Sequence, residues 1–357
     1  MSKCRFLYQN EITAAAQISV SSSMYGVIGG IFAEQLGSAT VQNGGQYSGD
    51  VDMEYTVEID GVAGGKEVGQ ATFKWSDDGG QTWNEAGVLT QTNPYLMSNG
   101  VTVKFTSGAG NDLELADRWS WICKNNYGKQ KIFDLDRDTW YQSRTLDNPN
   151  TITLNFGAAK NIKACMILDH NISSGAIITL MGNDSDSWES PAYSQAIMWN
   201  SGKIGMYLDQ EYQYWRLQIS DQSNPDGCFK LGELYLGAYL ELLKNFVYGW
   251  DQFTDAFETV IQAKHGSKKT TLDYLQEGIA ISFQNLAKTD VDLLLALFKT
   301  VKNTTLGTIS PIFFNIESTD PHNFFLVHLN PRFNQVNTYL GLFNVFLELS
   351  EVVKSNV

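Results

Sequence analysis

The sequence predicts a mainly β protein built from sandwich domains. Its 357 residues are enough for two or three domains. Only 18% of the residues are charged, while Gly (31), Phe (19), Tyr (16) and Trp (9) are plentiful, which favours strands and turns over helical bundles. Apolar and polar residues alternate in several short segments, as in strands with one solvent-exposed face. Glycine clusters separate these segments and mark the turns between them.

Charge and hydropathy narrow the functional classes. The formal net charge of −14 argues against nucleic acid as the main partner, because phosphate binding needs basic side chains. We find no run of about 18 apolar residues, so no membrane insertion is expected. Residues 1–5 are not followed by an apolar stretch, so no signal peptide is expected. The four cysteines (Cys4, Cys123, Cys165 and Cys228) are far apart, which predicts buried thiols rather than disulfides or a zinc site.

Residues 36–127 are expected to form one β domain. Alternating segments at 56–59, 71–75 and 101–105 predict its strands. Residues 76–83 read SDDGGQTW and resemble the Asp-box, a hairpin turn found in sialidases and many other β proteins. In such a turn an Asp side chain accepts hydrogen bonds from nearby groups, and glycine permits positive φ. A single Asp-box predicts a turn and carries no sialidase chemistry.

Residues 128–240 continue the strand pattern, with expected strands at 152–156, 162–168 and 214–219. Residues 131–143 read KIFDLDRDTWYQS, residues 152–157 read ITLNFG, and residues 231–237 read LGELYLG. Together they resemble the discoidin (coagulation-factor C-type) jelly roll. The opening strand of that family matches residues 14–23, more than a hundred residues upstream. We therefore expect a discontinuous jelly roll of residues 1–35 plus 128–240, interrupted by the inserted domain.

The discoidin resemblance implies two kinds of site. The acidic turn and the Glu near the last strand often hold a structural calcium ion, whose oxygen ligands would here be Asp134, Asp136, Thr139 and Glu233. Leu135 stands where the family usually has Gly. A solvated acidic turn capped by Arg137 is the alternative. Such domains also bind sugars through aromatic faces and polar loop groups at one end of the barrel. The candidate ligand-binding residues are Trp140, Tyr141, Arg144, Trp188 and Trp199.

Residues 241–357 predict a β-sandwich with one packed helix. Residues 259–263 and 275–283 are expected to form a hairpin around a turn at 265–269. Residues 290–302 carry apolar side chains at helical spacing, with Thr289 as the expected N-cap and Asp290 in the first turn. Further strands are expected at 309–316, 324–329 and 339–349. The apolar stripe of the helix needs an apolar sheet face to cover.

The last domain resembles the sandwich-plus-helix modules of bacteriophage tail tubes and distal tail proteins. This resemblance implies a structural virion protein of a phage tail or baseplate, located in the virion. Its C-terminal sandwich would assemble with other copies in a ring and with other tail proteins, and its jelly roll would project outward for decoration or adsorption to a host-surface glycan. The alternative is a carbohydrate-binding protein or an accessory module of a glycan-processing system. No catalytic motif is present, so we expect neither an enzyme nor a cofactor beyond the calcium ion.

Overall fold

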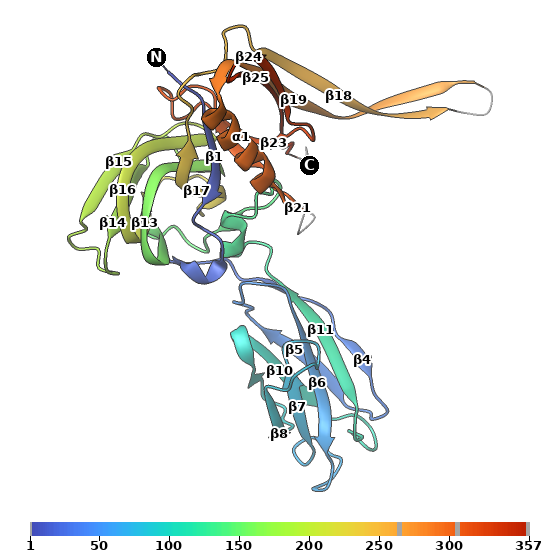
Figure 1. Ribbon diagram of the computed structural model, residues 1–357. Coiled ribbons are helices and arrows are strands. Elements are labelled where there is room, and N and C mark those ends of the chain that lie inside the picture. The colour runs from blue at the N-terminus through green and yellow to red at the C-terminus, as the bar shows by residue number, and fades with distance from the viewer. Residues whose placement is uncertain (1, 263–265, 304–307, 355–357) are drawn as a thin grey trace. The chain divides into compact units, whose positions relative to one another are not determined.

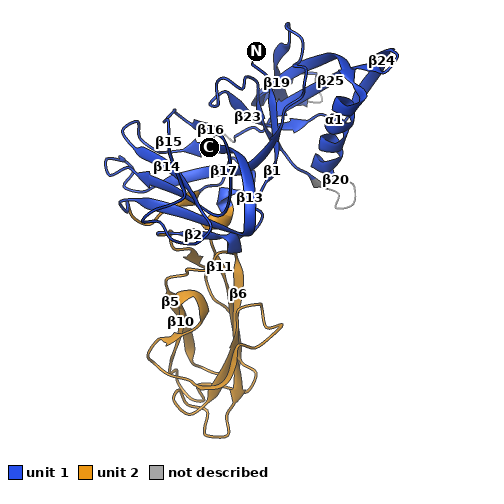
Figure 2. Ribbon diagram, turned by 60° about the vertical axis from the view of Figure 1, so that its left-hand side comes forward, with its two compact units in different colours: residues 1–21, 131–140, 146–357 blue, residues 22–130, 141–145 orange. Residues whose placement is uncertain are grey.

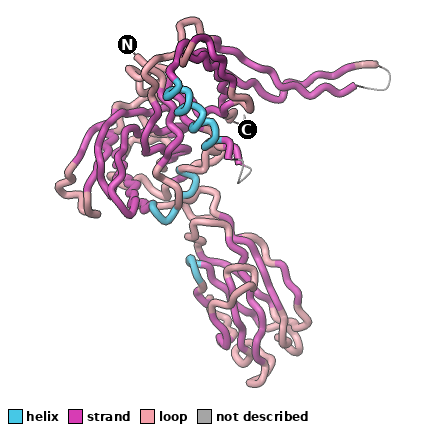
Figure 3. The backbone as a smooth tube through the Cα atoms, viewed as in Figure 1, coloured by secondary structure: helices cyan, strands magenta, loops and turns pink. Residues whose placement is uncertain are grey.

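The computed structural model describes residues 2–262, 266–303 and 308–354, which form a mainly β protein (Figure 1; Figure 3). This confirms the predicted fold class. One α-helix, α1 (Lys288–Val301), occurs in these ranges, with the short 3-10 helices η1 (Ala15–Gln17), η2 (Ser98–Gly100) and η3 (Lys129–Ile132). No helix of the described residues is both long and apolar enough to cross a membrane.

Contacts divide the chain into two compact units (Figure 2). Unit 1 contains residues 1–21, 131–140 and 146–357, and unit 2 contains residues 22–130 and 141–145. The inserted domain was expected to begin at residue 36, but unit 2 begins earlier. The reason is that β3 (Val27–Ile28) and β4 (Phe32–Glu34) both pair with β11 (Arg118–Lys124).

The first part of unit 1 is an antiparallel sheet in the order β15-β14-β16-β13-β17. Its strands are β13 (Asn150–His170), β14 (Ile177–Asn183), β15 (Tyr193–Ile197), β16 (Lys203–Ser220) and β17 (Lys230–Leu240). Strand β2 (Ile18–Val20) pairs with β13, so that Ile18 lies opposite Leu154. Strand β13 is continuous where two strands were expected, because an irregularity around Gly157, at φ 73°, lets the chain bend without breaking the pairing.

Strand β1 (Arg5–Asn10) joins this sheet to the C-terminal part of unit 1. It pairs with β17 on one side and with β22 (Ile312–Asn315) on the other. Its Phe6 ring lies 5.1 Å from the ring of Phe314, centroid to centroid. One buried cluster therefore spans both parts and contains Leu7, Ala164, Met166, Leu168, Tyr235, Phe313, Phe324 and Leu326. The alternation in the sequence had not identified this strand.

The C-terminal part continues the same sheet in the order β22-β23-β25-β19-β18. Its remaining strands are β18 (Asp251–Gln262), β19 (Lys268–Ala287), β20 (Lys302–Asn303), β21 (Thr308–Ile309), β23 (Phe324–Leu329), β24 (Asn334–Tyr339) and β25 (Leu342–Glu351). The predicted hairpin is confirmed and is longer than expected, since Asp251 lies opposite Ala280 and Gln262 opposite Lys268. Residue 263, the last residue of the expected strand 259–263, and residue 265, the first residue of the expected turn, lie outside the described residues.

Three boundaries in the C-terminal part differ from the prediction. Helix α1 begins at Lys288 with Ala287 as its N-cap, so Thr289 is a helical residue and not the cap. The expected strand 339–349 is instead the hairpin β24–β25, which turns at Gly341 with φ 75°. The expected strand 309–316 is divided before β22 by Pro311, which has no N–H to donate to a neighbouring strand.

Unit 2 is a sandwich of two sheets. One has the order β5-β10-β9 and the other the order β3-β11-β6-β7-β8, with β4 also on β11. The strands of these sheets not yet given are β5 (Thr40–Gly45), β6 (Met53–Gly61), β7 (Thr72–Ser76), β8 (Glu85–Leu89), β9 (Tyr95–Leu96) and β10 (Val101–Thr106). The short strand β12 (Tyr141–Gln142) belongs to neither sheet. The Asp-box lies between β7 and β8. As predicted, an Asp side chain organises this turn: the Asp78 carboxylate accepts bonds from the Ser76 hydroxyl (2.6 Å) and from the amide and hydroxyl of Thr82 (2.9 and 2.6 Å).

Candidate functional site

A pocket of about 320 Å³ lies where β13 ends in unit 1. Five segments contribute to it: the turn before β12, the end of β13, the turn before β16, the start of β17 with the loop before it, and the segment after β25. Its lining combines one indole ring with charged and amide side chains. The lining residues are Thr139, Trp140, Asp169, His170, Asn171, Gly202, Asp226, Lys230 and Lys354.

Hydrogen bonds fix the orientation and the tautomer of His170. Its Nδ1 accepts the backbone N–H of Ile172 at 3.1 Å, and its Nε2 lies 3.1 Å from the carbonyl oxygen of Asn200. Nε2 therefore carries the proton and donates it to that carbonyl. Burial lowers the pKa of His170, which favours the neutral ring. His170 thus shapes the pocket as a neutral, rigid group.

Asn171 holds the opposite wall of the pocket together. Its amide nitrogen donates to the Cys228 carbonyl at 2.8 Å and to Asp226 at 3.1 Å, and its amide oxygen accepts the Lys230 N–H at 2.7 Å. The Lys230 ammonium lies 3.1 Å from the Asp226 carboxylate. The hydrogen bond from Asn171, followed by Lys230, lowers the pKa of Asp226. The wall therefore presents a carboxylate and an ammonium group side by side.

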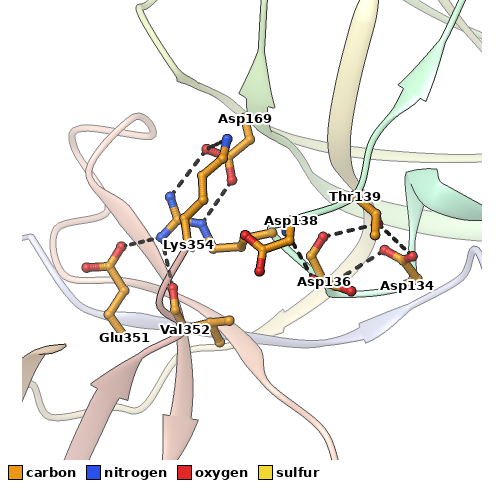
Figure 4. Close-up of polar contacts among 9 residues, drawn as sticks. Asp134, Asp136, Asp138, Thr139, Asp169, Glu351, Val352 and Lys354 are labelled. Carbon is orange, nitrogen blue, oxygen red and sulfur yellow. Dashed lines mark hydrogen bonds and ion pairs between the residues drawn. The ribbon is translucent and has the colours of Figure 1, made fainter. Parts of the chain in front are cut away.

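Arg137 links the pocket to the C-terminal strand, and its partners Asp169, Glu351 and Val352 are labelled in Figure 4. Its Nε and Nη2 donate to the two oxygens of Asp169 at 2.9 and 3.3 Å. Its Nη1 donates to Glu351 at 2.8 Å and to the Val352 carbonyl at 3.0 Å. The sequence suggested Arg137 only as a cap for the acidic turn, because Glu351 and Val352 are more than 200 residues away.

The structure brings one of the five predicted sugar-binding residues into the pocket. Trp140 lines it, whereas Trp199 is not among the lining residues and donates its indole N–H to the Ile172 carbonyl at 2.8 Å. Trp188 lies elsewhere in unit 1, with the Arg216 guanidinium 4.4 Å from its ring centroid. Tyr141 is only 1% exposed and donates its hydroxyl to the Ser22 carbonyl, so its ring has no free face.

Arg144, the last of the five, belongs to unit 2. Its guanidinium lies 4.8 Å from the ring centroid of Tyr25 and donates to the Tyr25 hydroxyl. The pocket residues that the sequence did not identify are Asp169, His170, Asn171, Asp226, Lys230 and Lys354. Asp169, His170 and Asn171 form a polar run directly after the apolar segment 164–168, and this run was the signal that the sequence offered for those three.

The predicted calcium-binding turn adopts a tight, internally bonded form (Figure 4). The Thr139 hydroxyl donates to Asp134 at 2.8 Å, and the Asp136 N–H donates to the other Asp134 oxygen at 3.3 Å. Leu135, which stands where the resemblance implies Gly, has φ 59°, in the left-handed region that favours glycine.

Glu233 lies fully buried on β17, with the Asp134 side chain and the backbone of Leu135 and Asp136 beside its carboxyl group. Burial, and then the charge of Asp134, raises its pKa to about 10. The carboxylates of Glu233 and Asp134 and the hydroxyl of Thr139 are oxygen ligands of the kind that a hard cation such as Ca²⁺ prefers. The described residues contain no group of three or more His, Cys, Asp or Glu side chains placed to hold a metal, so backbone and hydroxyl oxygens would complete the set.

No family model and no curated protein matches this chain. Among solved structures it is similar to chitosan-binding module 2 of a chitosanase/glucanase from Paenibacillus sp. IK-5, in complex with chitotriose (15% identity, TM-score 0.27, 32% of this chain and 89% of that chain). It is also similar to the fucose-binding module SpX-3 of Streptococcus pneumoniae (13% identity, TM-score 0.27, 33% of this chain and 89% of that chain). A third similar structure is the C-terminal domain of a Bacteroides fragilis chitobiase (16% identity, TM-score 0.26, 33% of this chain and 84% of that chain).

The first two of these structures are binding modules for chitosan and for fucose, and each of the three matches about a third of this chain. The comparisons give no support to the predicted identity as a phage tail or baseplate protein.

Proposed function

We propose that the pocket at the end of β13 binds a carbohydrate, and that the protein acts without catalysing a reaction. The observation that carries this proposal is the meeting of the Trp140 indole with the adjacent Asp226 and Lys230 pair in one pocket. A sugar ring presents C–H groups on its faces and hydroxyl groups at its edge. The indole suits the face, while the carboxylate accepts from one hydroxyl and the ammonium donates to its neighbour. A volume of about 320 Å³ suits one or two sugar residues of a longer glycan.

The acidic turn is connected to this pocket. A Ca²⁺ ion, when bound, would neutralise the negative charge of the Glu233 and Asp134 carboxylates. Thr139 belongs both to this turn, through its bond to Asp134, and to the pocket lining. The turn therefore orders the segment that carries Trp140.

A glycan array followed by titration calorimetry tests the carbohydrate proposal. Trp140→Ala is expected to weaken binding of the best array ligand by about tenfold or more, as for the loss of a central aromatic contact. Trp188→Ala is the matched control, because it removes another half-buried Trp of the same unit outside the pocket. Binding that survives Trp140→Ala and is lost in Trp188→Ala would place the sugar elsewhere. Absence of any glycan binding by the folded full chain would overturn the proposal.

A second function, assembly with other copies, is favoured by the hairpin β18–β19. The outer part of this ribbon carries exposed apolar side chains, with Ile261 60% exposed, and the Phe257 and Tyr274 rings stack at 4.5 Å on it. Its other exposed apolar residues are Val260, Leu272 and Leu275. A two-stranded ribbon is marginally stable alone, and an open edge favours pairing with another chain. We propose that a second copy covers this ribbon, and the predicted ring, tail partners and virion location belong to this second function.

A further inference from the structure

The segment that follows β25 reaches the pocket although it lies outside the jelly-roll strands. Glu351 is the last residue of β25 and pairs with Val327, and the Val352 N–H then donates to the Leu326 carbonyl at 2.9 Å. Val352 also packs against the buried cluster that joins the two parts of unit 1. Lys354, two residues later, lines the pocket. The segment is therefore held by backbone pairing and apolar contact before it reaches the pocket.

Arg137 adds a polar anchor to this segment. Its side chain is largely buried and bonds at the same time to Asp169 in the pocket and to Glu351 and the Val352 carbonyl. A guanidinium with partly buried partners on both sides fixes their separation, because its donors lie in one rigid plane. Arg137 is thus a positioning residue for the C-terminal segment.

Lys354 keeps donors available to a ligand. Its ammonium lies 3.6 Å from Asp169, which is an ion-pair distance too long for a hydrogen bond. Asp169 is only 15% exposed and already accepts two bonds from Arg137, whereas the Lys354 side chain is 48% exposed. The exposed charge at this side of the pocket is therefore the ammonium group.

We propose that Lys354 is a specificity-determining residue that selects a carboxylated sugar, such as a uronic acid, over its neutral counterpart. The proposal rests on the carbohydrate-binding function argued above. A carboxylate at the edge of the sugar would accept from the Lys354 ammonium, while the Asp226 and Lys230 pair on the opposite wall contacts hydroxyl groups. The jelly roll alone then lacks the residue that sets the preference.

Calorimetric titration of the full chain with paired monosaccharides tests this inference: glucose with glucuronic acid, and galactose with galacturonic acid. The wild-type protein is expected to bind one acidic sugar about tenfold tighter than its neutral counterpart, as for one charge-assisted hydrogen bond. Lys354→Gln should remove this preference by weakening binding of the acidic sugar, and Lys354→Arg should restore most of it. Lys299→Gln, at an exposed lysine of α1, is the matched control and should leave the affinities for both sugars of a pair unchanged.

The outcomes separate the two proposals. If the wild-type protein binds sugars through Trp140 but treats both members of each pair alike, or if Lys354→Gln keeps the preference, the specificity role of Lys354 is wrong and the pocket remains a sugar site. If the folded wild-type protein binds neither member of any pair and no other glycan, both proposals are wrong. A preference that weakens as sodium chloride rises supports an exposed ionic contact.

Discussion

Single residues carry the electrostatic character of unit 1, and Glu233 is the clearest case. Burial and the neighbouring charge of Asp134 raise the pKa of the Glu233 carboxyl group to about 10, so this group stays protonated at neutral pH. An unfolded chain releases that proton near the ordinary Glu pKa of 4.5. Folding therefore takes up a proton between these two values, and stability falls as the pH rises from about 4.5 to about 10.

Glu233→Gln tests this residue directly. In EDTA at pH 8 the variant should be more stable than the wild-type protein by on the order of a few kcal/mol, because the amide needs no proton to remain neutral. The difference should shrink toward pH 4.5, where the wild-type carboxyl is protonated in both states. Urea unfolding followed by tryptophan fluorescence measures both free energies.

Calcium gives the complementary readout for Glu233. Adding Ca²⁺ at pH 8 should raise the unfolding midpoint of the wild-type protein and leave that of Glu233→Gln unchanged, since the charged ligand is gone. A variant that loses stability in EDTA would show that the native carboxylate is already satisfied by the protein. Equal calcium stabilisation of both proteins would remove Glu233 from the cation site.

At the scale of elements, the sequence predicted those whose pattern is local. The helix stripe of Val291 and Leu294 and the hairpin of β18 and β19 follow from short-range periodicity, and both are present. Strand β1 was missed because its partners β17 and β22 are hundreds of residues away. The pocket was missed for the same reason: Trp140 could be named from the acidic turn, but Asp226 and Lys354 join it only after folding.

The hairpin supplies a prediction at this scale. Sedimentation velocity should show assemblies of the wild-type chain that Ile261→Lys shifts toward monomers, because a lysine on an exposed ribbon opposes pairing with another copy. Leu293→Lys, at an exposed apolar position of α1, is the control and should leave the distribution unchanged. A wild-type chain that stays monomeric at all concentrations would contradict assembly through this ribbon.

At the scale of the whole molecule, the C-terminal part of unit 1 depends on the first strand of the chain. Phe6 packs with Phe283 and Phe314, and its neighbour Leu7 belongs to the cluster that also contains jelly-roll residues. A fragment of residues 241–357 therefore exposes apolar surface that β1 and β17 cover in the full chain. The sequence predicted a separate domain here because a hairpin and the single expected helix fall within residues 241–357, whereas the shared core appears only in three dimensions.

Excision experiments separate these alternatives. Residues 241–357 alone should lack a cooperative thermal transition by circular dichroism, while residues 22–145, which contain the separate core of unit 2, should unfold cooperatively. In the full chain, Phe6→Ala should lower the free energy of unfolding of unit 1 by about 3–5 kcal/mol, the usual cost of truncating a buried Phe. A stable, cooperative 241–357 fragment would show that the C-terminal sandwich folds without β1, and the Arg137 contact to Glu351 would then join two separate domains.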